Sequence, residues 1–214
     1  MRVYARAGVF AEGRTDYDFL LPLLDRLLDA LAASMFPGNY EIGATIGIDA
    51  PRGTEGGRAE KIAAAIRDAW EECTVFVVHS DGAGDPDEAR RTCVAPGLDA
   101  ARGAMSDRAV VAAACVPVRE IEAWMLTDPE VFRTLLGGAA ELTYPADPER
   151  EIDPKRTLRR LLDEGGARRA PERLYALFGE RVRLGTLRAL PAFRAFEAEL
   201  VAALQEVARL QGIA

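Results

Sequence analysis

Apolar residues change their spacing along the chain, and the changes mark strands and helices. Residues 3–11 are mainly apolar and have the length of a strand, and leucines then recur at helical spacing between Thr15 and Ala33. Residues 74–78 form a short apolar run, which is typical of a strand buried on both faces in a parallel sheet. The first part of the chain therefore predicts strands that alternate with helices.

The other elements of this part continue the alternation. They are a weak strand at 40–48, a glycine-rich loop at 49–57, a helix at 59–72, a helical stretch after residue 87 that is interrupted near Pro96 and Gly97, a strand at 109–116 and a helix at 119–136 with a joint at Asp128 and Pro129. Strands joined by helices imply right-handed crossovers. We therefore expect a doubly wound, Rossmann-like α/β fold, with a mainly parallel sheet flanked by helices.

After residue 137 the pattern contains helices only. They are expected at 154–164, 171–178 and 191–210. We therefore expect an α/β domain at 1–137 and a C-terminal helical appendage packed on it at 138–214. A length of 214 residues suits one sizeable core with an appendage better than two full domains.

The charge is acidic overall but uneven. A formal net charge of -7 excludes a protein that holds nucleic acid by bulk electrostatics alone. Between residues 153 and 196, however, eleven Lys or Arg stand against five acidic residues, so this segment carries +6. Its candidates for phosphate contacts are Lys155, Arg159, Arg160, Arg168 and Arg169. The alternative is an ordinary solvated helix face.

The chain lacks the sequence features of membrane proteins, secreted proteins and cysteine-based disulfide or zinc frameworks. No run approaches the roughly 18 to 20 apolar residues of a membrane helix, and the first residues show no signal-peptide pattern. We therefore expect a cytoplasmic protein with no membrane partner. Cys73, Cys93 and Cys115 lie far apart without a Cys-x-x-Cys pair, which argues against a disulfide framework and a thiolate zinc site.

Carboxylates follow three of the predicted strands. Glu12 follows the first strand, Asp81 and Asp85 follow the third, and Glu120 and Glu122 follow the fourth. A parallel sheet brings such strand ends together, where crowded carboxylates repel unless a cation neutralises them. Mg²⁺, or Mn²⁺ in its place, prefers oxygen ligands and leaves room for a substrate phosphate. The strand ends therefore predict a magnesium site.

Each candidate also has a purely structural interpretation. Asp16 lies where it can add a ligand, but Thr15 and Asp18 match a helix-capping pattern, and first-turn acids are favoured by the helix dipole. The acidic loop after the third strand can be solvated, with Asp87 as the cap of the next helix. His79, the single histidine, is interpreted as packed near the core rather than as a ligand.

The pair after the fourth strand depends on local backbone geometry. Glu120 and Glu122 are two residues apart, so both can face one site only if 117–122 is extended or turning. On a helix they would point about 200° apart. The alternative is that both are ordinary acids of a first helical turn.

Several motifs in order carry a family resemblance. FAEGRTD resembles the Glu-Gly-x-x-Asp turn of Toprim domains, and VVHSDGAGD lies where those domains carry an Asp-x-Asp loop, with Ala83 at the position of the second acid. With VPVREIEAWMLTD, DPKRTL and LPAFRAFEAEL, the chain is similar to a bacterial Toprim-like family of unknown function. Its members are often encoded beside an ATPase related to overcoming-lysogenization-defect nucleases. The resemblance spans nearly the whole chain.

The resemblance implies Mg²⁺-dependent processing of phosphodiesters, with Glu12 as general acid or base. The positions that it implies for metal are Glu12, Asp81 and Asp85, with Asp16, Glu120 and Glu122 at a second site. We therefore expect a nuclease or nuclease subunit that acts on DNA or RNA, in phage defence with a partner ATPase. The alternatives are a non-catalytic Toprim-like binding or regulatory subunit and a phosphohydrolase of a small phosphate ester.

Overall fold

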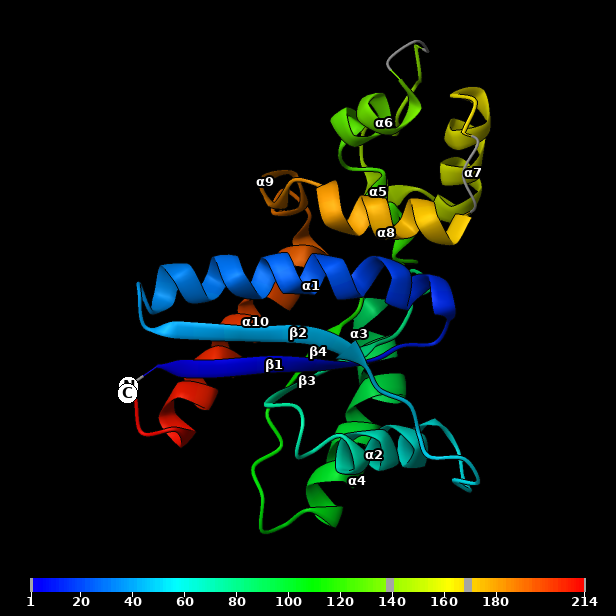
Figure 1. Cartoon of the computed structure of the whole chain (residues 1–214). Coiled ribbons are helices and arrows are strands. Elements are labelled where there is room, and N and C mark those ends of the chain that lie inside the picture. The colour runs from blue at the N-terminus through cyan, green and yellow to red at the C-terminus, as the bar shows by residue number, and fades with distance from the viewer. Residues whose placement is uncertain (1, 138–140, 168–170, 214) are drawn as a thin grey trace.

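A parallel sheet forms the centre of the computed structural model, which describes residues 2–137, 141–167 and 171–213. The four strands lie in the order β2-β1-β3-β4 and are all parallel (Figure 1). They are β1 (Val3–Phe10), β2 (Tyr40–Gly47), β3 (Val75–His79) and β4 (Ala112–Cys115). The predicted parallel α/β fold, flanked by helices and Rossmann-like, is confirmed.

Helices cover both faces of the sheet. On one face lie α1 (Arg14–Met35) and α10 (Pro191–Leu210), and on the other α2 (Arg58–Asp68) and α4 (Ala95–Ala104). Successive side chains of β3 alternate between the two hydrophobic clusters: Val75 and Val77 pack with the first pair of helices, Phe76 and Val78 with the second. Because β3 is buried on both faces, its run is apolar throughout, as its sequence predicts.

The strand order reverses between β1 and β3. The chain passes from β1 outward to β2, then returns across β1 to β3 and continues to β4. In open parallel sheets, such a switch point leaves a crevice at the carboxyl ends of the two strands. Glu12 follows β1 and Asp81 follows β3, so the topology brings these two candidates to the same crevice.

The later helices pack on this core rather than apart from it. They are α5 (Glu122–Met125), α6 (Pro129–Leu136), α7 (Pro154–Glu164), α8 (Pro171–Arg181) and α9 (Leu184–Leu187), with a 3-10 turn at Pro148–Arg150. Helix α8 runs beside α1, where the Arg26 guanidinium donates to the carbonyls of Gly179 and Val182 at 2.8 Å each. The boundary predicted after 137 adjoins 138–140, outside the described residues, and stays a prediction.

Helix α10 contacts β4, the edge strand at the opposite end of the sheet from β2. There a carboxylate oxygen of Glu199 accepts the backbone N–H of Ala114 in β4 at 2.8 Å, and the other pairs with Arg90. Among the helices that the structure describes, none is long and apolar enough to span a membrane.

Two helix predictions need correction. The stretch after residue 87 is not interrupted at Pro96: α3 (Pro86–Ala89) runs through a π-helical segment (Arg90–Val94) directly into α4. A proline lacks the N–H of the regular helical hydrogen bond, and the wider π turn before it lets the helix continue.

The helix predicted at 119–136 begins only at Glu122. The carbonyls of Val118 and Arg119 accept the N–H groups of Gly84 (2.8 Å) and Ala83 (3.2 Å), so they are bound to the loop after β3 instead of a helical turn. Residues 117–121 therefore turn, which is the condition that the sequence set for Glu120 and Glu122 to face one site.

Candidate acidic metal centre

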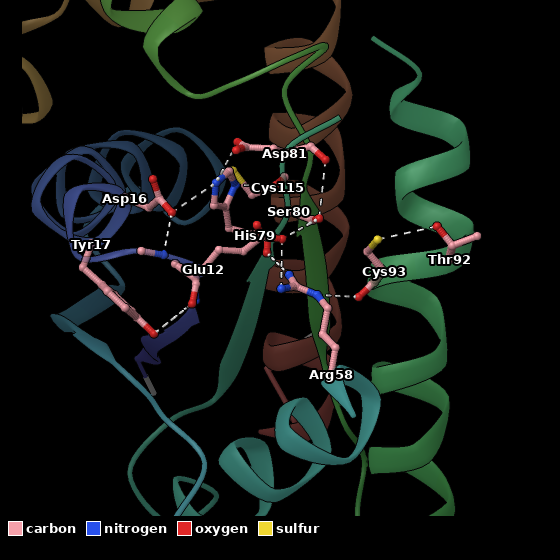
Figure 2. Close-up of polar contacts among 12 residues, drawn as sticks. Glu12, Asp16, Tyr17, Arg58, His79, Ser80, Asp81, Thr92, Cys93 and Cys115 are labelled. Carbon is pink, nitrogen blue, oxygen red and sulfur yellow. Dashed lines mark hydrogen bonds and ion pairs between the residues drawn. The ribbon is translucent and has the colours of Figure 1, made fainter. Parts of the chain in front are cut away.

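Two of the predicted metal ligands meet around one histidine nitrogen. The Nε2 atom of His79 lies 3.5 Å from Oδ1 of Asp81 and 3.8 Å from Oδ2 of Asp16 (Figure 2). The Nδ1 atom on the other side of the ring lies 2.9 Å from the carbonyl oxygen of Cys115 in β4. Asp16 from α1 and Asp81 from the loop after β3 therefore share one end of the crevice, with the His79 ring between them.

The field at this point is strongly acidic. Burial raises the pKa of Asp16, and the charges of Asp81 and Glu122 raise it further, against the opposing effect of His79 and the Gly13 N–H. His79 is completely buried, which lowers its pKa, but Asp81, Cys115 and the charge of Asp16 outweigh burial and hold the pKa well above its usual value. The charges of these carboxylates therefore raise the pKa of Asp16 and the pKa of His79.

Asp16 also closes the first turn of α1. Its Oδ2 accepts the N–H of Gly13 at 2.9 Å, and Gly13 is the N-cap residue. The capping pattern predicted for Thr15 and Asp18 is therefore wrong, and the helix begins two residues earlier. This hydrogen bond holds the Asp16 carboxylate at the crevice. Asp16 can therefore cap the helix and bind a metal ion from the same position.

Glu12 lies at the mouth of the crevice, half exposed and held by two partners. One of its carboxylate oxygens accepts the Ser80 hydroxyl at 3.0 Å and pairs with Nη1 of Arg58 at 2.9 Å. The same guanidinium donates to the carbonyls of His79 (2.6 Å) and Cys93 (3.0 Å). Sequence reasoning missed Ser80 and Arg58 as partners of Glu12, and the only signal was the position of Arg58 beside the glycine-rich loop.

Glu120 and Glu122 converge on Lys155 at the start of α7. Glu122 is almost fully buried, accepts the Tyr175 hydroxyl at 2.8 Å and lies 3.4 Å from the Lys155 ammonium. Glu120 accepts the backbone N–H of Lys155 at 3.3 Å. Burial and then Glu122 raise the pKa of Glu120, with a further effect of Asp81, so this pair belongs to the same acidic field. Glu122, chiefly, raises the pKa of Lys155.

Asp85 has a different position from the other candidates. It is exposed, and its carboxylate accepts the N–H of Glu88 at 3.0 Å as the N-cap of α3. The cap predicted for Asp87 is therefore wrong by two residues. Positive φ angles at Ala83 (49°) and Gly84 (100°) turn the chain between Asp81 and Asp85. The geometry supports Asp81 as a ligand and gives no such support to Asp85.

The cationic candidates of the later helices divide into three groups. Lys155 contacts the acidic centre, as described above. Arg160 pairs with Glu164 at 3.0 Å on the exposed side of α7, while Arg159 is exposed and its charge acts on Tyr175. Arg168 and Arg169 lie outside the described residues. Phosphate contacts by these side chains stay a prediction.

A pocket of about 440 Å³ opens beside Glu12. It lies between the Glu12 carboxylate, the glycine-rich loop that begins at Asp49 and the Lys61 side chain of α2. An adjoining pocket of about 330 Å³ shares Glu12 and Lys61 and is also lined by Arg58. At the start of the loop, Asp49 accepts the Tyr17 hydroxyl at 3.0 Å. Arg58 and Lys61, one helical turn apart on α2, flank the space next to Glu12, which suits a phosphate group.

The centre fits a cation at one point. Within 2–137, 141–167 and 171–213, no three His, Cys, Asp or Glu side chains form a complete metal site as they stand. Oδ1 of Asp81, however, is buried and has no hydrogen-bond partner in that part of the chain, and neither has Nε2 of His79. A bound cation would satisfy such atoms among crowded carboxylates. Asp16 and Asp81 would hold it, with Glu12 and Glu122 nearby.

Comparisons of the chain with protein-family models, with curated proteins and with solved structures gave no match. The Toprim-like resemblance therefore rests on the motifs alone and stays a prediction. The Rossmann-like parallel sheet and the position of the acidic side chains at its switch point come from the structure.

Proposed function

We propose that this chain is a divalent-metal-dependent phosphodiesterase, acting as a nuclease or as the nuclease subunit of a larger assembly. One observation carries the proposal: Asp16 and Asp81 meet around His79 at the switch point, and the buried Oδ1 of Asp81 has no partner in the described part of the chain. Carboxylates held together in this way are stabilised by Mg²⁺ or Mn²⁺, which also bind phosphate oxygens.

The arrangement of the side chains suits hydrolysis. The bound cation would lower the pKa of a water molecule and neutralise charge on the phosphate. Glu12 is half exposed, and Ser80 and Arg58 orient its carboxylate, so it is placed to take a proton from the attacking water. Lys155 lies 3.4 Å from Glu122 and supplies positive charge close to the acidic side chains.

The substrate we propose is DNA or RNA. Support comes from the pocket beside Glu12, where Lys61 and Arg58 suit the next phosphate of a strand. Because the chain as a whole is acidic, further affinity has to come from the cationic segment around α7 or from a partner. The partner ATPase and the role in phage defence follow from the family resemblance, and the cytoplasmic setting from the sequence; all three belong to the proposal.

The experiment compares Asp81→Asn with Asp87→Asn, a nearby acid on the exposed face of α3. Labelled single-stranded and duplex DNA, RNA and a small phosphate ester are incubated with each protein in Mg²⁺ or Mn²⁺. We expect cleavage of a nucleic acid by the wild type, a loss of roughly 100-fold or more in Asp81→Asn, and no loss in Asp87→Asn.

Two results would overturn the proposal. Hydrolysis of the small ester alone would favour a phosphohydrolase. No hydrolysis in either metal, together with no metal-dependent rise in the melting temperature, would favour a non-catalytic binding subunit.

A further inference from the structure

His79 has an unused nitrogen at the acidic centre. The imidazole is completely buried in β3, and its Nε2 has no hydrogen-bond partner among the described residues. Buried polar atoms of a native protein almost always have a partner. The nitrogen faces the carboxylates of Asp81 and Asp16 at 3.5 Å and 3.8 Å, so this point of the site favours a positive charge, which is either a proton on Nε2 or a bound metal ion.

The ring is oriented as metal-bound histidines are. Because the carbonyl oxygen of Cys115 can only accept, Nδ1 donates to it at 2.9 Å, and Nε2 is left as the nitrogen that binds either a proton or, in its place, a metal ion. The backbone is held as well, because His79 pairs with Cys115 in the sheet and its carbonyl accepts from Arg58 at 2.6 Å. The nitrogen is therefore held in place and directed between Asp16 and Asp81 (Figure 2).

The spacing of the three atoms suits one ion. Metal–ligand bonds of about 2.1 Å place neighbouring ligand atoms about 3.0 to 3.4 Å apart. Nε2 of His79 lies 3.5 Å from Oδ1 of Asp81 and 3.8 Å from Oδ2 of Asp16, so both carboxylates have to move slightly closer to the nitrogen before they share an ion with it.

An ion can reach this point from one side. The side chain of Asp81 is 41% exposed, whereas those of Asp16 and His79 are 14% and 0% exposed. Access is therefore past Asp81, the most exposed of the three side chains. The protein would occupy three coordination positions and leave the exposed ones to water and a substrate phosphate.

We infer that His79 is a ligand of the metal, together with Asp16 and Asp81, and that the centre selects a first-row transition ion such as Mn²⁺ over Mg²⁺. Imidazole nitrogen suits transition ions, whereas Mg²⁺ prefers a shell of oxygen atoms only. The inference rests on the metal centre proposed above and names its third ligand and its ion.

The composition of the chain makes a direct test possible. His79 is the single histidine of 214 residues, so in tag-free protein any imidazole signal belongs to it. Pulsed electron paramagnetic resonance of the full chain with Mn²⁺ should show the hyperfine coupling of a directly bound ¹⁴N. The measurement needs no variant, so a substitution that impairs folding does not affect it.

A second measurement compares metals. By calorimetry, wild type should bind Mn²⁺ at least about tenfold more tightly than Mg²⁺. His79→Gln should lose about tenfold or more in Mn²⁺ affinity and the nitrogen coupling, but keep its Mg²⁺ affinity within about threefold. Asp87→Asn serves as the matched control and should behave as wild type.

The outcomes separate this inference from the proposed function. Tight Mn²⁺ binding without nitrogen coupling would overturn the role of His79, which would then be a counter-ion of Asp16 and Asp81, and would leave the metal centre intact. No binding of either ion would overturn the metal centre itself. Equal affinity for Mn²⁺ and Mg²⁺ would overturn the selectivity.

Discussion

Asp128 and Arg183 form a two-point ion pair in which the acid is completely buried. Nε and Nη2 of Arg183 lie 2.8 Å and 2.6 Å from Oδ2 and Oδ1 of Asp128, and the Arg183 N–H donates to the same carboxylate at 2.9 Å. Asp128 is also the N-cap of α6. One carboxylate thus joins the start of α6 to the segment between α8 and α9.

This pair predicts a pH dependence of stability. Although burial acts to raise the pKa of Asp128, its hydrogen bonds with Arg183 and Glu130 outweigh burial and lower it. The stabilisation is therefore complete above the unfolded pKa of about 3.9 and is lost as the pH falls through the lower folded pKa. Asp128→Asn should unfold more easily by about 1 to 3 kcal/mol at pH 7.

Urea unfolding between pH 3 and 7 checks this prediction. The difference in free energy of unfolding between wild type and Asp128→Asn should shrink below about pH 4, because the wild type loses its carboxylate charge at position 128 and the variant has none to lose. A difference that stays constant across this range would show that the carboxylate charge contributes nothing.

Glu12→Gln separates chemistry from stability. In the structure, the Glu12 carboxylate forms an ion pair with Arg58. Because this pair is partly exposed, its loss should change the free energy of unfolding by no more than about 1 kcal/mol. Metal-dependent cleavage should fall by roughly 100-fold or more if Glu12 is the base. Lower stability with unchanged specific activity would make Glu12 a structural acid.

Lys61→Ala tests the pocket beside Glu12. If Lys61 contacts a phosphate, the variant should bind a labelled oligonucleotide less tightly, and the slope of log affinity against log salt should fall by about one. Binding is measured without metal, so cleavage does not interfere. Arg67→Ala, an exposed position on the same helix but outside the pocket, is the control. Equal slopes in all three proteins would remove Lys61 from the binding surface.

Gly82→Ala tests how the loop after β3 is held. A Cβ atom at Gly82 would lie 2.2 Å from the carbonyl oxygen of Pro117, so the loop and the turn after β4 must separate. We expect a loss of about 1 to 3 kcal/mol in stability and weaker metal binding, because Asp81 moves with the loop. Gly103→Ala in α4 is the control: a Cβ atom there has open space, so the free energy of unfolding should rise by about 0.5 to 1 kcal/mol. Thermal melts with and without Mn²⁺ measure both effects.

The sequence predicted those features that depend on local patterns. Proline at the first turn marked α7 and α10, whose bounds agree with the prediction to the residue. The strand ends were also predictable, because a parallel sheet collects them at one edge. That Asp16 and Asp81 lie at the same edge follows from this rule.

Contacts between distant segments were not predictable. Arg58 reaches Glu12 from α2, and Tyr175 reaches Glu122 from α8, and neither side chain belongs to a motif. The first three residues of the helix predicted at 119–136 are not helical for the same reason, because the N–H groups of Ala83 and Gly84 bind the carbonyls of Arg119 and Val118. At these residues, hydrogen bonds between distant segments outweigh the local helix propensity.

Glu199 has a consequence for how this protein can meet other chains. An unpaired edge strand is a template on which a foreign strand can add. At β4, the carboxylate of Glu199 already takes the outward N–H of Ala114, and Arg90 holds that carboxylate in place. A strand that arrives there must displace this charged pair before it can bind the Ala114 N–H. The pair thus makes sheet extension at β4 less favourable, for aggregation and for assembly with another chain alike.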